Sequence, residues 1–175
     1  MEIISVPIKG ELEHKDSMGN VHVIKQGDIQ VMSAGKGIYH SEFNKSQNDK
    51  TNFLQIWVFP NKKNVEPRYD QITLKTTDQK NKLQQILSPN PDDDGVWIHQ
   101  NAWFYMAEMD KDKEIEHQLN KSENGIYAFV IEGNVEIEGQ KLEKRDGFGI
   151  WDTTKIKIKS TSEAKVLLME VPMSI

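Results

Sequence analysis

His40 and Glu42 form the clearest candidate for chemistry in the sequence. Because side chains two positions apart on a strand point to the same face, the imidazole and the carboxylate would lie side by side, with Cα atoms about 7 Å apart. Such a pair supplies half of the ligands of a divalent metal site of the non-haem iron, manganese, nickel or copper kind. Glycines at positions 35 and 37 allow a sharp turn just before the pair. The alternative is a hydrogen-bonded pair of surface side chains.

The other histidines offer weaker candidates. If residues 16–20 form a hairpin loop, His14 sits opposite His22, and two histidines across an antiparallel pair can share a metal ion. Two surface imidazoles near a turn are the favoured alternative. His99 and His117 have no partner at ligand spacing, so we expect ordinary polar positions for both.

Three further patterns give no clear indication of a functional site. The acidic run 92–94 lacks the spaced ligands and the distal Glu of a calcium loop. The segment 34–37 is not a phosphate loop, because no Ser or Thr follows its lysine and no helix is expected after it. The four tryptophans are expected in the core or at the mouth of a barrel; alternatively, Trp57 lines an apolar pocket beside His40 together with Met32 and Phe53.

The composition limits the class of protein. The chain has 175 residues and 20.2 kDa, which is enough for one ordinary domain or two small ones. Its net charge is −5 and its basic residues form no stripe, so nucleic acid is not an expected partner. Zero cysteines exclude disulfides and thiolate chemistry and fit a reducing compartment. With no apolar run of about 20 residues and no signal-peptide pattern, we expect a cytoplasmic protein without membrane contact.

The pattern of short apolar segments separated by turns predicts an all-β fold, a sandwich or a barrel. Residues 53–59 form a mostly apolar strand that Pro60 ends. Residues 155–159 alternate strictly between lysine and isoleucine, and the lysines are expected to form a solvated face that protects a sheet edge. The only helix expected is Asp78 to Leu87.

Two domains are predicted. Segments 60–75 and 88–95 are rich in Pro, Asn, Asp and Lys, which favours a boundary near residue 72 and domains 1–72 and 73–175.

The two halves also resemble each other. Residues 8–13 and 131–136 share a strand–Gly–strand pattern, which indicates an internal repeat of one β-barrel unit.

Several consecutive motifs together resemble the pirin family, whose members are bicupins. The segments that carry the resemblance are EHKDSMGN (13–20), GDIQVMSAGKGIYHSE (27–42), LQIWV (54–58) and EPRY (66–69). The resemblance implies two cupin-type β-barrels or jelly rolls, with one mononuclear metal site in the N-terminal barrel. It also implies a C-terminal domain, residues 73–175, without metal ligands. Bacterial members include quercetin 2,3-dioxygenases, so the resemblance implies an oxidoreductase that opens a flavonol.

The metal site that the resemblance implies matches this chain only in part. The family pattern has a His-x-His pair on an early strand, followed by the His and Glu of a His-Ser-Glu segment, and only His40 and Glu42 carry over as ligands. The His-x-His pair precedes a Met-Glu-Ile segment, which this chain matches at residues 1–3. We therefore expect a truncated N-terminal cupin that lacks about 60 residues of upstream strands of the jelly roll. With two ligands, the divalent metal ion (Fe, Mn, Ni, Cu or Zn) would be held weakly or not at all.

The resemblance also implies a mechanism. A bound metal ion would lower the pKa of a flavonol hydroxyl, and Glu42 would take its proton as general base. The alternative is a catalytically inactive cupin scaffold that acts as a binding or regulatory module. The expected partners are a small aromatic, flavonol-like ligand and further copies of this chain, because a barrel without its first strands exposes edges that pair between chains.

Overall fold

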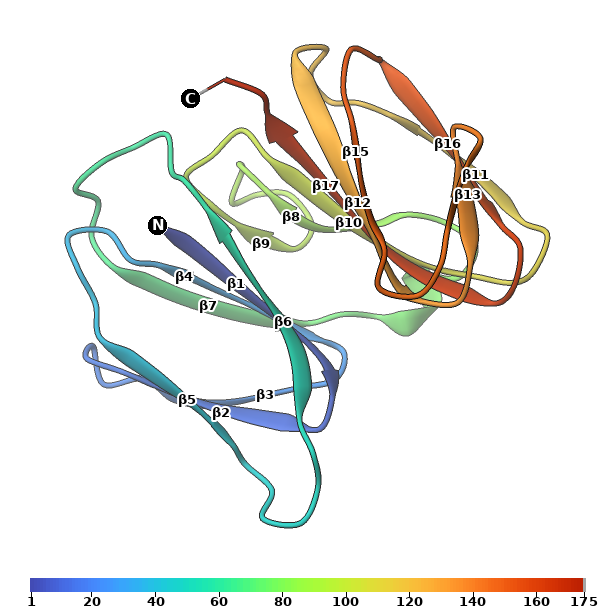
Figure 1. Cartoon of the computed structure of the whole chain (residues 1–175). Helices are drawn as coiled ribbons and strands as arrows, with labels where there is room; N and C mark the ends of the chain where they lie inside the picture. The colour runs from blue at the N-terminus through green and yellow to red at the C-terminus, as the bar shows by residue number, and fades with distance from the viewer. Residues whose placement is uncertain (175) are drawn as a thin grey trace. The chain divides into compact units, whose positions relative to one another are not determined.

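A computed structural model describes residues 1–174, apart from the side chain of Thr76. The chain forms two compact units, which are coloured from blue to green and from green to red in Figure 1. The first unit contains residues 1–74 and 89–100, and the second contains residues 75–88 and the chain from 101 onward.

The first unit consists of two antiparallel sheets. One sheet has the strand order β6-β1-β4-β7, with β1 at Glu2–Lys9, β4 at Asp28–Ser33, β6 at Asn52–Val58 and β7 at Arg68–Thr73. The other has the order β3-β2-β5, with β2 at Glu11–Asp16, β3 at Val21–Lys25 and β5 at His40–Asn44. The short strand β9, Val96–Trp97, also belongs to this unit.

The turn at Gly10 leads the chain from the first sheet into the second. Its φ of +76° lies in the left-handed region, and a Cβ atom added there would lie 2.9 Å from the carbonyl oxygen of Lys50. Only glycine combines this conformation with this close approach. The two sheets face each other, because the Ser5 hydroxyl on β1 donates a hydrogen bond to Glu42 on β5.

The second unit repeats the two-sheet arrangement. Its larger sheet contains the neighbouring strands β15-β12-β17-β10-β8, at Gly147–Ile150, Asn124–Glu132, Ala164–Pro172, Trp103–Met109 and Gln84–Ser88. Its smaller sheet has the order β11-β16-β13-β14, at Glu114–Gln118, Lys155–Ser160, Val135–Ile137 and Gln140–Leu142. Side chains from both sheets form one apolar core, which includes Ile126, Val130, Ile137, Ile156, Ile158, Val166 and Leu168.

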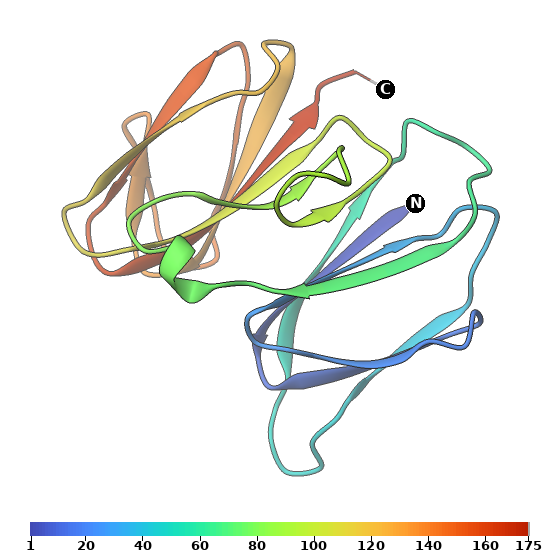
Figure 2. The ribbon, with the colours of Figure 1, turned by 180° about the vertical axis from the view of Figure 1, so that it is seen from behind.

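The all-β prediction is confirmed, whereas the helix expected at Asp78 to Leu87 is wrong. The described residues of this region form a 3-10 turn, η1, at Thr76–Asp78, which Figure 2 shows as a short coiled ribbon. The rest of the expected helix contains β8, which pairs with β10 and buries Ile86 and Leu87. Pairing with a distant strand thus overrides the local preference of the segment.

One other expectation is wrong, and another loses one of its two alternatives. The strand with alternating lysines, β16, is not at an edge, because it pairs with both β11 and β13. Its alternation reflects one solvated face and one buried face of the same strand. Trp57 and Trp151 are 63% and 59% exposed, so of the two expected positions the core does not apply to them, and the mouth of a barrel stays a prediction.

The strand–Gly–strand pattern occurs in both units. Gly133 follows β12 with a φ of +77°, close to that of Gly10 after β1. Among the described residues, no helix is long and apolar enough to cross a membrane.

Glu170 on β17 is the buried carboxylate that anchors a loop of the second unit. Its side chain is fully buried and accepts hydrogen bonds from the backbone N–H groups of Asn120 and Lys121 and from the side-chain amides of Asn120 and Asn124. Burial raises the pKa of Glu170, whereas these donors and the neighbouring His117 lower it, and the net shift is downward. Glu170 is therefore ionised in the folded state at neutral pH.

We expect Glu170→Gln to lower the free energy of unfolding by about 2–3 kcal/mol at pH 7, because several donors lose a charged acceptor. The pKa of Glu170 is lower in the folded state than in the unfolded state. The extra free energy of unfolding of wild type over the variant is therefore present above the unfolded pKa of about 4.3. It is lost as the pH falls through the pKa of Glu170 in the folded state. Urea unfolding at several pH values measures the difference. The control Glu116→Gln, at an exposed ion pair with Lys155, should change stability by less than about 1 kcal/mol; an equal loss in both variants would contradict the assignment.

Candidate metal site

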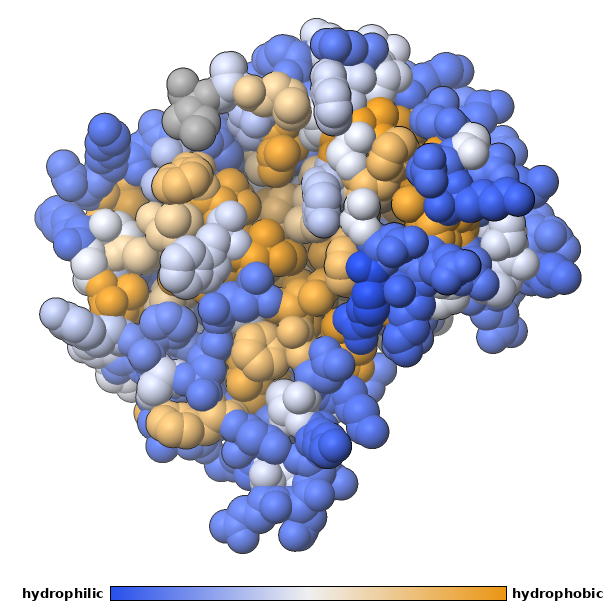
Figure 3. Space-filling model, in the orientation of Figure 1, coloured by the Kyte–Doolittle hydropathy of each residue, from blue (hydrophilic) through white to orange (hydrophobic). Residues whose placement is uncertain are grey.

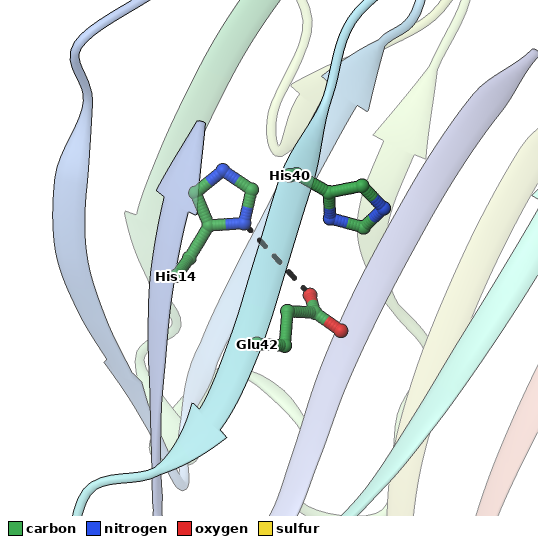
Figure 4. Close-up of side chains that lie close together, drawn as sticks. All are labelled: His14, His40 and Glu42. Atoms are coloured by element: carbon green, nitrogen blue, oxygen red, sulfur yellow. Dashed lines mark ion pairs between the residues drawn. The ribbon is translucent and has the colours of Figure 1, made fainter. Parts of the chain in front are cut away.

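His14, His40 and Glu42 converge between the two sheets of the first unit. Each offers one ligand atom, and these three atoms lie within 4.8 Å of one another. Figure 4 shows that His14 comes from β2 and that the other two side chains come from its neighbour β5. The register pairs His14 with Glu42 and Asp16 with His40, so the three side chains share one face of the sheet.

The imidazoles carry ring nitrogens without a hydrogen-bond partner. Nδ1 of His14 and Nδ1 of His40 are both buried, and neither has a partner among the described residues. Nδ1 of His14 lies 3.9 Å from Oε1 of Glu42, which is too long for a hydrogen bond. Unpaired buried nitrogens are costly, whereas two imidazoles and a carboxylate at this spacing are suitable ligands for a divalent transition metal. The residues present therefore fit a metal ion.

Asp16 orients the His14 ring. Its Oδ2 lies 3.3 Å from Nε2 of His14, and its carboxylate also accepts hydrogen bonds from the backbone N–H groups of Met18 and Asn20. When Nε2 carries the ring proton and donates a hydrogen bond to Asp16, Nδ1 presents a lone pair toward Glu42. A carboxylate behind a metal-binding histidine is a common means of fixing this orientation.

Glu42 is held in place from the opposite sheet. Its Oε1 accepts a hydrogen bond from the Ser5 hydroxyl at 3.2 Å, and its Oε2 accepts one from Nε2 of Gln55 at 2.6 Å. Burial raises the pKa of Glu42, whereas the neighbouring His14 and Ser5 lower it, and the net shift is downward. The carboxylate is thus ionised at neutral pH, the form that binds a cation.

The two carboxylates make the position of His14 favourable for positive charge. Burial lowers the pKa of the His14 imidazole, whereas Glu42 and Asp16 raise it, and the net shift is upward. The side chain of His14 is fully buried and that of Glu42 is 11% exposed, so little solvent screens this attraction.

Tyr69 on β7 separates the candidate site from a surface groove. Its ring lies 5.0 Å from that of His14 and stacks on His22 at 4.8 Å. Its hydroxyl donates to Oε1 of Gln71 at 2.7 Å, and burial raises its pKa, so it remains a neutral donor. The groove, about 360 Å³, is lined by His22, Val23 and residues 69–73.

The predicted register of His14 opposite His22 is confirmed. The expectation that both are surface imidazoles is wrong for His14, which is fully buried. His22 stays exposed behind Tyr69 and does not belong to the group of possible ligands.

The structure brings His40 and Glu42 together, and their role as ligands stays a prediction. The expectation of two ligands missed His14, because only the pairing of β2 with β5 places it beside Glu42. His117 is not an ordinary polar position: it is 7% exposed, and its Nε2 lies 3.5 Å from Glu170. His99 is half-buried, with its ring edge-on to Trp97 at 4.9 Å.

Comparisons with known proteins identify the family. The family model described as Pirin matches residues 1–58, and the one described as Quercetinase C-terminal cupin domain matches residues 85–171. A quercetin 2,3-dioxygenase of Escherichia coli strain K12 is 38% identical over 172 residues, which cover 98% of this chain and 73% of the relative. The chain belongs to the pirin family.

Solved pirin structures have the same fold. The crystal structure of YhhW from Escherichia coli superimposes with a TM-score of 0.92 at 37% identity, covering 98% of this chain and 71% of YhhW. A second structure, bacterial pirin YhhW in complex with nickel(II), gives a TM-score of 0.91 at 37% identity and covers 98% of this pirin and 72% of YhhW. The predicted resemblance and the cupin-type fold are confirmed, and this pirin is homologous to quercetin 2,3-dioxygenases.

We expect Asp16→Ala to lower the free energy of unfolding by about 1–3 kcal/mol, because the N–H groups of Met18 and Asn20 lose a charged, buried acceptor. Urea unfolding followed by circular dichroism measures the loss. The matched control is Asp92→Ala at an exposed turn, which should stay within about 0.5 kcal/mol of wild type. Equal stability of both variants would show that Asp16 does not anchor this loop.

Proposed function

We propose that this pirin binds a divalent transition metal ion through His14, His40 and Glu42 and acts as a quercetin 2,3-dioxygenase. Such an enzyme catalyses the oxidative opening of a flavonol by dioxygen. The observation that carries the proposal is the pair of buried, unpartnered imidazole nitrogens beside an ionised carboxylate, all within 4.8 Å. Two histidines and one carboxylate with open positions are the ligand set of non-haem iron oxygenases.

The comparisons support the same assignment. The Escherichia coli relative is named a quercetin 2,3-dioxygenase, and a pirin of the same fold is described in complex with nickel(II). Iron, manganese, nickel, copper and zinc remain the candidate ions.

The chain's own residues have distinct roles in this proposal. His14 and His40 bind through ring nitrogens, and Asp16 keeps the His14 ring in its orientation. A metal ion bound there would act as a Lewis acid that favours the anion of a flavonol hydroxyl. Glu42 would accept the proton of this hydroxyl at a carboxylate oxygen, while Ser5 and Gln55 hold the carboxylate in place.

The test measures metal content and turnover together. After reconstitution with Fe²⁺ or Ni²⁺, the wild-type chain should hold one metal ion per chain by mass spectrometry and consume oxygen when quercetin is added. His14→Ala, His40→Ala and Glu42→Gln should each weaken metal binding by more than about 100-fold, the upper limit for residues that only orient a ligand. Turnover should fall to background in each variant.

His22→Ala is the matched control, because His22 lies opposite His14 in register yet stays exposed. It should leave metal content and turnover unchanged. A wild-type chain that binds no metal would favour the inactive cupin scaffold, and a metal-loaded chain that leaves quercetin intact would overturn the proposed dioxygenase activity.

We retain three further proposals. The two cupin domains comprise residues 1–72 and 73–175, with segment 89–100 of the second domain belonging to the first compact unit. The ligand is a small flavonol-like aromatic, and the protein works in the cytoplasm.

We also infer that copies of this chain associate. β5 and β6 are end strands of their sheets, and Phe43, Trp57 and Phe59 on or beside them are more than half exposed. Apolar side chains gather over these strands in Figure 3. An exposed end strand with apolar side chains favours pairing with another chain.

Sedimentation at micromolar concentration should therefore give a dimer or larger assembly. Phe59→Lys should shift the distribution toward the monomer, whereas Trp151→Lys in the other unit, which is similarly exposed, should not. A monomeric wild-type chain would contradict the inference.

A further inference from the structure

A row of polar side chains crosses the β6-β1-β4-β7 sheet on the face toward the candidate metal site. Ser5 identifies this face, because its hydroxyl donates to Glu42 of the opposite sheet. Residues directly opposite each other in an antiparallel pair share a face. Ser5 is paired with Gln55 on one side and with Gln30 on the other, and Gln30 is paired with Gln71.

Three members of this polar row are engaged within the protein. Ser5 and Gln55 donate to the two oxygens of Glu42. Gln71 accepts from the Tyr69 hydroxyl through its carbonyl oxygen and donates through Nε2 to groups of the same unit. The polar groups of Ser5 and Gln55 therefore fix the position of the Glu42 carboxylate, and those of Gln71 hydrogen-bond to other groups of the first unit.

Gln30 differs from the rest of the row. It is 1% exposed, and neither its Nε2 nor its Oε1 has a hydrogen-bond partner among the described residues. A buried polar group left unpaired costs about 1–3 kcal/mol, and such groups are rare in native proteins. Gln30 lies directly opposite Ser5 on the neighbouring strand, so its side chain is on the face of the sheet that Glu42 contacts.

The adjacent row on the same face is apolar and aromatic. This row lies two residues from the polar row on each strand. In it, Ile3 is paired with Trp57 and with Met32, and Met32 is paired with Tyr69. The face toward the metal site thus presents a polar row beside an apolar row. This arrangement matches a flat aromatic molecule that carries its polar atoms along one edge.

We propose that Gln30 is a specificity-determining residue that hydrogen-bonds the adjacent hydroxyl and carbonyl groups of a planar aromatic ligand. This inference rests on the proposed function for the class of ligand. A carboxamide donates through nitrogen and accepts through oxygen at the same time. It therefore complements a hydroxyl next to a carbonyl, whereas an apolar residue of the same size would not distinguish this edge from a hydrocarbon edge.

The test compares quercetin with luteolin, which lacks only the hydroxyl next to the ring carbonyl. Isothermal titration calorimetry is carried out on the full chain, both as purified and after chelator treatment, so that a resident metal ion does not determine the preference. The wild-type chain should prefer quercetin in both states. Gln30→Met should weaken quercetin binding by about tenfold, which corresponds to the loss of one or two hydrogen bonds, and the ratio of the two dissociation constants should approach one.

Two controls separate recognition from folding. Gln30→Met removes a buried unpaired amide, so its melting temperature should equal or exceed that of wild type. Gln79→Met makes the same substitution at a buried glutamine of the second unit and should leave both dissociation constants unchanged.

The outcomes for Gln30 are independent of turnover. A Gln30→Met chain with unaltered preference for quercetin would overturn the proposal, as would a wild-type chain that binds neither flavonoid or both equally. A wild-type chain without oxygen consumption, but with a preference that depends on Gln30, would overturn the proposed enzymatic activity and leave the ligand-binding role of Gln30 supported.

Discussion

The first unit depends on one constraint, the burial of an imidazole between two carboxylates. His14 is removed from solvent, and the carboxylates of Asp16 and Glu42 offset its desolvation. This arrangement requires β2 to pair with β5 in one register, because a shift by one residue would turn His14 away from Glu42. The loop anchor at Asp16 and the contacts of Glu42 with Ser5 both follow from that register.

The two units use the same turn and the same two-sheet plan for different purposes. Between the sheets of the second unit lies an apolar core, and its fully buried carboxylate, Glu170, is satisfied by donors from one loop. The first unit instead places histidines and glutamines between its sheets and leaves several of their polar atoms unpaired. The same two-sheet plan thus places a metal-binding type of side-chain cluster, His14 with His40 and Glu42, in the first unit.

The sequence predicted the parts of the fold that depend on local patterns. Turn residues and alternation indicated the all-β class, and the two-residue spacing of His40 and Glu42 placed both on one face. His14 was missed because its proximity to Glu42 arises from a strand pair that closes over more than twenty residues of intervening chain. The expected helix failed for the same reason, since β8 is defined by its distant partner β10. Local patterns predict hairpin neighbours such as β2 and β3, but not strand pairs that are distant in the sequence.

β5 is the outer strand of its sheet and carries two of the three candidate ligands. A strand with one hydrogen-bonded neighbour opens by local fluctuation more readily than a strand enclosed on both sides. Its amide protons should therefore exchange with deuterated solvent earlier than those of β1 or β4. A cation that joins β5 to β2 would slow this exchange, so occupancy of the site would be recorded in the backbone dynamics of a single strand.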